Sequence, residues 1–178
     1  MPLFKSYPKV DLEFRTKSVQ LEPLKSELPI ANCIVAFSLM PKELAKRLDK
    51  KAPSIKRRVD AIEKLAAMGW PIGLRFDPLI YSKDWKQLYK GLLMDIMRRV
   101  PSESIHSISY GPLRYPKKMY QDITKLYPEE LLFSIPMSEN NGYIDYGVDV
   151  EQEMTEFLIN NLKNYVEEAK LFQCVVQA

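Results

Sequence analysis

Residues 54–79 read SIKRRVDAIEKLAAMGWPIGLRFDPL, and they predict a helix that is followed closely by a strand. Ser54 suits the N-cap of the helix and Gly69 suits its end. One helix face is apolar at the spacing of a helix and carries Ile55, Val59, Ile62 and Ala66. From residue 71 to 79, apolar residues alternate with small or charged ones, which is typical of a strand. This order of elements indicates an α/β fold.

The same order of strands and helices extends to both sides of this unit. Strands are predicted at residues 11–18, 33–39, 104–110 and 171–176, and helices at 83–100, from Pro116 onward, and at about 150–169. Strands separated by helices are typical of parallel βα units. From this pattern alone, a doubly wound sheet and a barrel are both possible.

The length and composition describe a single folded domain. The 178 residues suffice for a hydrophobic core, and 46% hydrophobic with 28% charged residues is the balance of a soluble protein. Two cysteines, Cys33 and Cys174, are too few for a disulfide framework or a zinc site, so we expect a reducing, cytoplasmic location. No apolar run is long enough to span a bilayer and residues 1–10 have no signal-peptide core, so we expect no membrane partner.

Basic residues are concentrated in residues 41–59, which contain eight Lys and Arg against Glu43 and Asp49. Such a stretch can bind the phosphates of a nucleic acid, or it can be the solvated face of helices. DNA is therefore a possible partner, although the charge alone does not establish it.

The predicted strands have one polar face. In the first strand, one face carries Leu12, Phe14 and Thr16 and the other carries Glu13, Arg15 and Lys17. In the second strand, the two faces carry Val35, Phe37 and Leu39, and Ile34, Ala36 and Ser38. In the third strand, they carry Ile72, Leu74 and Phe76, and Gly73, Arg75 and Asp77. Parallel strands that are covered on both faces are almost continuously apolar, so only one face is expected to lie under helices. The charged groups of the other face must pair or line a polar cavity. An antiparallel sheet with one solvent face is the alternative, but the helices between the strands leave no room for hairpins.

Three polar side chains, those of Lys17, Ser38 and Asp77, lie near the carboxyl ends of their strands, where α/β proteins bind ligands. Lys17 could hold a carboxylate or phosphate, and Ser38 could donate a hydrogen bond. Arg75 with Asp77 forms either an ion pair or a substrate clamp; alternatively, Arg75 neutralises Glu13 or Asp77.

Common catalytic motifs are absent from the sequence. There is no glycine-rich phosphate loop and no Ser-His-Asp arrangement. His106 is the only histidine and is predicted to be structural, while Cys33 and Cys174 are predicted to be core residues. We therefore predict no catalytic residue and no metal ligand in this chain.

Four segments, in order, resemble the spore photoproduct lyase family of radical S-adenosylmethionine (AdoMet) enzymes, which are often described as DNA photolyase-related. They are IVAFSLMP (34–41), the segment 54–81, SISYGPLRYPKKMY (107–120) and a closing segment that starts with LYPEELLFSIPM (126–137). The resemblance extends over residues 11–176. It implies a partial TIM barrel, of which this chain would form half: about four parallel βα strands, a C-terminal helix and a terminal strand. We expect barrel βα units over residues 1–130 and a family-specific C-terminal extension over 131–178.

The resemblance also implies two cofactors, AdoMet and a four-iron four-sulfur cluster. The family binds the cluster through C-x-x-x-C-x-x-C, which this sequence lacks together with the family's hydrogen-donating cysteine. Both are expected to belong upstream of its first residue. By position in the family motifs, the implied AdoMet-side residues are Lys17, Ser38 and Asp77, and the implied substrate-side residues are Arg75, Arg114, Tyr143 and Tyr146.

The expected function is the C-terminal part of a protein similar to spore photoproduct lyase, which repairs a thymine lesion in DNA. We expect a truncated or split reading frame that is inactive alone and associates with an N-terminal half or a second copy. The alternatives are a non-catalytic nucleic-acid-binding module that uses residues 42–58, and an inert remnant.

Overall fold

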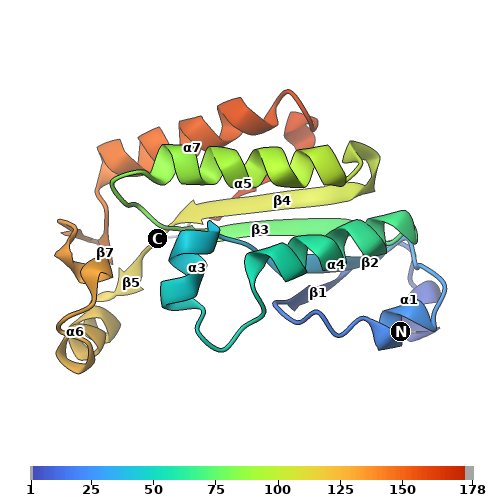
Figure 1. The fold of residues 1–178 in the computed structure, drawn as a ribbon, viewed down its shortest axis with the longest axis horizontal. Coiled ribbons are helices and arrows are strands. Elements are labelled where there is room, and N and C mark those ends of the chain that lie inside the picture. The colour runs from blue at the N-terminus through green and yellow to red at the C-terminus, as the bar shows by residue number, and fades with distance from the viewer. Residues whose placement is uncertain (1, 175–178) are drawn as a thin grey trace.

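Five parallel strands form the main sheet in the order β1-β2-β3-β4-β8 (Figure 1). The structure is a computed structural model that describes residues 2–174. The strands are β1 (Leu12–Thr16), β2 (Cys33–Ser38), β3 (Ile72–Leu79), β4 (Ile105–Pro112) and β8 (Leu171–Gln173). The predicted α/β class and the parallel βα units are confirmed, and the terminal strand joins the sheet beside β4.

The long helices cover one face of the main sheet, whereas α6 (Lys117–Leu126) packs on the small sheet described below. The other helices are α1 (Pro2–Lys5), α2 (Glu22–Lys25), α3 (Lys42–Leu48), α4 (Ile55–Ala67), α5 (Trp85–Arg99) and α7 (Val148–Leu162). The long helices α4, α5 and α7 lie together on the same side (Figure 1). A doubly wound sheet has helices on both faces, so the arrangement is that of an opened barrel wall. None of the described helices is long and apolar enough to cross a bilayer.

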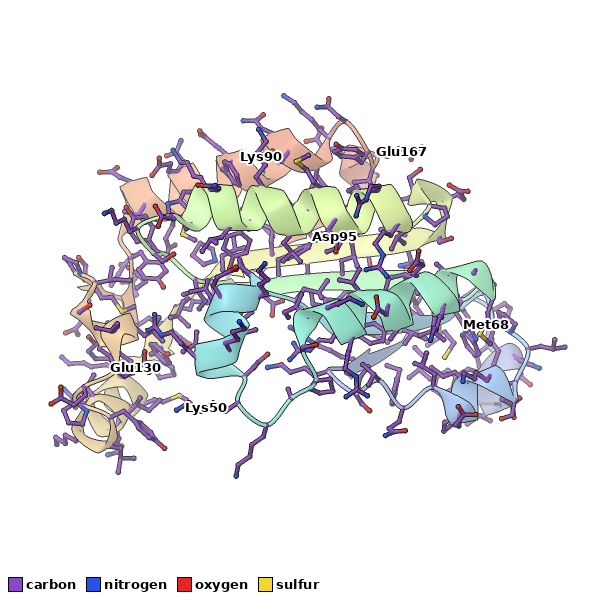
Figure 2. All side chains as sticks on the ribbon, viewed as in Figure 1. Lys50, Met68, Lys90, Asp95, Glu130 and Glu167 are labelled. Carbon is purple, nitrogen blue, oxygen red and sulfur yellow. The ribbon has the colours of Figure 1, made fainter. Side chains whose placement is uncertain are left out.

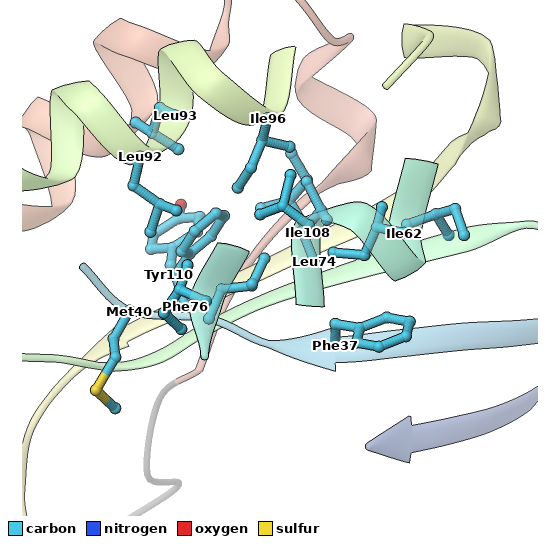
Figure 3. Packing of buried hydrophobic residues seen from close by; sticks show 14 of the residues in the cluster. Phe37, Met40, Ile62, Leu74, Phe76, Leu92, Leu93, Ile96, Ile108 and Tyr110 are labelled. Atoms are coloured by element: carbon cyan, nitrogen blue, oxygen red, sulfur yellow. The ribbon is translucent and has the colours of Figure 1, made fainter. Parts of the chain in front are cut away.

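The hydrophobic core lies between this helical layer and the apolar face of the strands. Figure 3 shows α5 and α4 packed onto β2, β3 and β4 through Leu92, Leu93, Ile96, Ile62, Phe37, Leu74, Phe76, Ile108 and Tyr110. The alternation in the sequence predicted this face correctly for β2 and β3. In β1, however, Phe14 is 50% exposed, because β1 is an edge strand and the helix that follows it, α2, has only four residues.

A second, small sheet lies beyond the carboxyl ends of β3 and β4, at the left of Figure 1. It is antiparallel, with the order β5 (Tyr115–Pro116), β7 (Tyr143–Asp145) and β6 (Ser138–Asn140). Its strands come from both sides of residue 130, where the sequence predicts a domain boundary. The division into 1–130 and 131–178 stays a prediction.

Several element limits differ from those predicted. The predicted helix at 150–169 ends at Leu162, and a short 3-10 helix (Glu168–Lys170) precedes β8. The next helix begins at Lys117, so Pro116 is its N-cap rather than its first residue. The predicted terminal strand extended to residue 176, and residues 175 and 176 lie outside the described part of the chain. Two further 3-10 helices are Ser102–Ser104 and Leu131–Ser134.

Candidate functional site

The carboxylate of Asp77 is the centre of a polar cluster at the carboxyl ends of the strands. Arg15 from β1 forms an ion pair with Asp77 Oδ1 and reaches Ser38 Oγ at 3.3 Å. The hydroxyl of Ser109 in β4 donates to Asp77 Oδ2 at 3.0 Å, and the Cys174 thiol, directly after β8, does so at 3.1 Å. One carboxylate therefore connects β3 with β1, β4 and the end of β8.

The partners of Asp77 keep it ionised. Burial alone would raise the pKa of Asp77, but the hydrogen bonds from Arg15, Cys174 and Ser109 more than offset this and lower it. Burial and the neighbouring Asp77 carboxylate raise the pKa of the Cys174 thiol. Asp77 is thus an anion at neutral pH, and Cys174 is a neutral thiol that donates to it.

A second ion pair lies two residues earlier along the same strands. Arg75 is only 5% exposed, and its Nε and Nη2 bond to the two carboxylate oxygens of Glu13 at 3.0 and 2.6 Å. Arg75 also donates to the hydroxyl and the carbonyl oxygen of Ser107 at 2.9 and 3.1 Å. The Arg75 hydrogen bond lowers the pKa of Glu13 below its ordinary value. Among the interpretations of Arg75, the structure contains the ion pair with Glu13, and the substrate-side role of Arg75 stays a prediction.

Gly73 leaves the space through which the Arg75 side chain passes. A Cβ atom added to Gly73 would lie 2.7 Å from Arg75 Nη2 and 2.8 Å from the Cβ atom of Ala36. A small residue is therefore needed at position 73, because the Arg75 side chain crosses the backbone there. We refer to Glu13, Arg15, Ser38, Arg75, Asp77, Ser107, Ser109 and Cys174 together as the polar face.

Lys17 lies at the end of β1 but belongs to a separate group of charges. Its Nζ is 2.5 Å from Asp49 Oδ1, and Arg58 Nη2 is 2.8 Å from Asp49 Oδ2. Arg58 also donates to the carbonyl oxygen of Ser38 at 2.9 Å. Burial alone would raise the pKa of Asp49, whereas the bonds from Lys17 and Arg58 lower it overall. The structure thus joins Lys17 to the end of β2 through Asp49 and Arg58, and not to Asp77.

The predicted substrate-side residues lie near the small sheet. Arg114 donates to the carbonyl oxygen of Cys174 at 2.8 Å, and Tyr143 is half-buried in β7. Tyr146 is 5% exposed, and its hydroxyl accepts a hydrogen bond of 3.1 Å from the backbone N–H of Tyr81. Burial raises the pKa of Tyr146. Arg114 and Tyr143 are both half-buried, whereas Tyr146 is buried and supports the backbone after β3.

The sequence reasoning missed part of the polar face. It placed Arg15 on this face without assigning it a role, and it did not single out Ser109. Cys174 was predicted to be a core residue, but it is half-buried and bonded to Asp77. The alternation of Ser107 and Ser109 along the fourth strand was the available signal, because it continues the polar face of β3.

The basic stretch at residues 41–59 is not one solvated surface. Arg58 is completely buried, and Arg47 pairs with Glu130 at 2.5 Å. At least two of the eight cations in this stretch therefore serve the fold, which weakens the alternative of a nucleic-acid-binding module.

The described residues do not fit an iron–sulfur cluster. Within residues 2–174, no group of three or more His, Cys, Asp or Glu side chains could hold a metal ion. Cys33 is buried at the amino end of β2, whereas Cys174 follows the carboxyl end of β8. The two thiols therefore lie at opposite ends of a parallel sheet.

The family model and the curated relatives that match this chain carry the same family name. The family model "Spore photoproduct lyase" matches residues 3–172. The spore photoproduct lyase of Bacillus subtilis (strain 168) is 22% identical over 169 residues, which are 90% of this chain and 49% of that protein. The one from Clostridium acetobutylicum is 23% identical over 170 residues, with 89% and 49% coverage. The chain thus spans about half the length of the curated relatives it matches.

Solved structures agree in fold. A spore photoproduct lyase double mutant with bound AdoMet and dinucleoside spore photoproduct matches with a TM-score of 0.72 and 16% identity, over 94% of this chain and 51% of that one. A complex with dinucleoside spore photoproduct gives 0.71 and 17%, over 92% and 50%. These likenesses confirm the architecture that the resemblance implied, half of a barrel of parallel βα units. With a family model that matches nearly its whole length, the chain belongs to the spore photoproduct lyase family.

Proposed function

We propose that this chain forms the AdoMet-side and lesion-side wall of a protein that acts on a thymine lesion in DNA, as spore photoproduct lyase does. The observation that carries the proposal is the polar face, which ends at Asp77 on the side of the sheet without helices. In α/β barrels, ligands bind at this end of the strands. The match to a structure that holds both AdoMet and dinucleoside spore photoproduct supports the same conclusion.

The residues at this end fit AdoMet by the chemistry of their side chains. Arg15 and Lys17 are cations that are each 43% exposed, and they suit the carboxylate of the ligand. Asp77 suits its amino group, and Ser38 offers a half-buried hydroxyl. Bound AdoMet would supply the radical chemistry that the family resemblance implies. Within residues 2–174 no group of side chains could ligate an iron–sulfur cluster, so we assign these residues binding and orientation only.

The lesion side of the wall consists of Arg114 and Tyr143 near the small sheet. Arg114 can pair with a phosphate oxygen, and Tyr143 offers an aromatic face on which a base can stack. Arg75, which the resemblance places on the same side, is held by Glu13 and Ser107, so its role is to order the face. The remainder of the active site would come from an N-terminal half or a second copy, as predicted.

Calorimetric titration of the full chain with AdoMet, and separately with dinucleoside spore photoproduct, tests this function. We expect AdoMet to bind with one site per chain and a Kd below about 1 mM. Lys17→Ala should weaken AdoMet binding about tenfold, and Tyr143→Ala should weaken binding of the dinucleoside about tenfold, because it removes the ring on which a base stacks.

Lys64→Ala is the matched control, because Lys64 is exposed on α4 and far along the helix from this end. Absence of binding to both ligands would overturn the proposal. Equal effects of the Lys17 and Lys64 substitutions would remove Lys17 from the site.

A further inference from the structure

A groove lies on the outer, helical side of the sheet, away from the polar face. It has a volume of about 780 Å³ and is enclosed by α3, the loop at residues 49–54, the start of α4, and α5. Figure 2 shows Lys50 on the loop that borders it and Asp95 on α5. Sites for small molecules typically measure 300–1,000 Å³, so the groove is large enough for one.

The floor of the groove is apolar. Ala45, Ile55 and Leu92 lie there with at most 8% of their surface exposed, and Leu88 is half-buried. Gly91 of α5 faces open space, since a Cβ atom added to it would meet nothing within 4 Å. A flat apolar group can therefore approach the backbone of α5 without displacing a side chain.

The rim of the groove has an excess of positive charge. Its lysines are Lys42, Lys46, Lys50 and Lys56, and its acidic residues are Glu43, Asp49 and Asp95. Each acidic residue is already paired: Glu43 with Lys42, Asp49 with Lys17 and Arg58, and Asp95 with Arg98.

Two of the rim lysines form no ion pair with a described residue. Among the residues that the structure describes, neither Lys46 nor Lys50 has a carboxylate oxygen within 4.0 Å, although the Lys50 charge contributes to lowering the pKa of Glu130, which pairs with Arg47. The first turn of α4, with Ser54 as its cap, also lines the groove, and the N-terminus of a helix favours an anion. Both features select a negatively charged ligand.

We propose that this groove binds a small amphipathic anion, that is, a flat apolar body with one acidic group. The apolar floor takes the body, and Lys46 and Lys50 take the acidic group. The alternative function, a nucleic-acid-binding module, would place the sugar-phosphate backbone of DNA on this stretch. That backbone is charged along its length and would leave the apolar floor of the groove without an apolar partner. No residue of the polar face lines the groove, and the one link to the proposed function is Asp49 on its rim, which pairs with Lys17.

Fluorescence titration of the full chain with 1-anilinonaphthalene-8-sulfonate tests the proposal, because this probe has a flat apolar body and one sulfonate. We expect saturable binding of one probe per chain. Gly91→Phe should fill the floor and weaken binding about tenfold or more. The double change Lys46→Glu with Lys50→Glu should weaken binding of the sulfonate about tenfold, and leave binding of the neutral N-phenyl-1-naphthylamine nearly unchanged.

The matched control is the double change Lys64→Glu with Lys90→Glu. It alters the net charge equally on α4 and α5, and both residues are exposed and lie outside the groove; Figure 2 shows Lys90 on the side of α5 near α7. Because the probe also binds partly unfolded states, each variant is compared at equal helicity by circular dichroism. Gly91→Leu replaces Gly91→Phe if the larger side chain prevents folding.

Four results would overturn the proposal. They are absence of saturable binding, wild-type affinity in the Gly91 variant that folds, equal losses in the two charge-reversal pairs, and displacement of the probe by a short DNA duplex. The last result would assign the groove to nucleic acid. Loss of AdoMet binding has no bearing on any of them, so this site and the proposed function fail separately.

Discussion

Replacing Arg58 by alanine is expected to destabilise the protein strongly, although Arg58 lies in the middle of a basic stretch. Its side chain is completely buried in the structure. It donates to Asp49 at 2.8 Å, to the carbonyl oxygen of Ser38 at 2.9 Å and to that of Pro53 at 2.9 Å. These three bonds tie α4 to the end of β2 and to the loop after α3. The change Arg58→Ala removes all of them and leaves a cavity.

The size of the effect follows from these contacts. Removing one partner of a buried ion pair costs about 3–5 kcal/mol. Asp49 still has Lys17 after the change, so we expect the lower end of this range, about 3 kcal/mol. In a protein of this size, each kcal/mol lowers the Tm by about 2–4 °C, which gives a decrease of about 6–12 °C.

Thermal melts followed by circular dichroism, together with urea unfolding, measure this effect. Arg57→Ala is the matched control, because Arg57 is the preceding residue, has the same side chain and is exposed. Its substitution should change the stability by no more than about 0.5 kcal/mol. Equal Tm shifts in the two variants would refute the assignment of Arg58 to the core, and would return it to the solvated basic surface.

Three further predictions concern the polar face and the small sheet. Gly73→Ala should lower the free energy of unfolding by about 1–3 kcal/mol, because the added Cβ collides with the Arg75 guanidinium. Gly91→Ala, in a helix and facing open space, should raise the free energy of unfolding by about 0.5–1 kcal/mol. Urea unfolding measures both changes, and changes of the same sign would contradict the packing argument. Ionised Asp77 stabilises the fold above its unfolded-state pKa of about 3.9, and this contribution is lost as the pH falls through its lowered folded-state pKa. The Tm of wild type should therefore exceed that of Asp77→Asn at about pH 6, and the gap should close toward about pH 2; a constant gap would exclude a role for the charge. Tyr146→Phe should cost about 1 kcal/mol through the lost hydrogen bond to the backbone, and Tyr143→Phe less than about 0.5 kcal/mol; equal melts would place both hydroxyls in solvent.

The elements with a strong local pattern were predictable from the sequence. For α4, the apolar spacing, the N-cap Ser54 and the terminal Gly69 all agree with the structure, where Ser54 Oγ accepts a hydrogen bond from the Arg57 N–H. The first four parallel strands lie close to the ranges predicted for them, and the fifth begins at Leu171 as predicted. In contrast, α3 and the strands of the small sheet were not predicted. They are short, and tertiary contacts rather than local pattern determine them.

Arg58 shows where the charge argument was wrong and what would have corrected it. A sum of charges along the chain treats all eight Lys and Arg of the basic stretch as equivalent. On a helix, however, residue 58 is three positions after Ile55 and four before Ile62, so it lies on the apolar face. A charged residue on that face must have buried partners. The periodicity that predicted the helix thus also held the information that Arg58 belongs to the core.

The two ion pairs of the polar face could not be derived from the sequence, because they join residues 62 positions apart. Once the strands are parallel and in register, the equal spacing has a simple cause: a step of two residues along β1 matches a step of two along β3. The order of charges is reversed between the strands: Glu13 pairs diagonally across β2 with Arg75, and Arg15 does so with Asp77. A slip of two residues would bring Arg15 to Arg75 or Glu13 to Asp77, and so set like charges together in a partly buried site. The ion pairs of the polar face therefore favour the observed register of β1 relative to β3, in addition to presenting polar groups to a ligand.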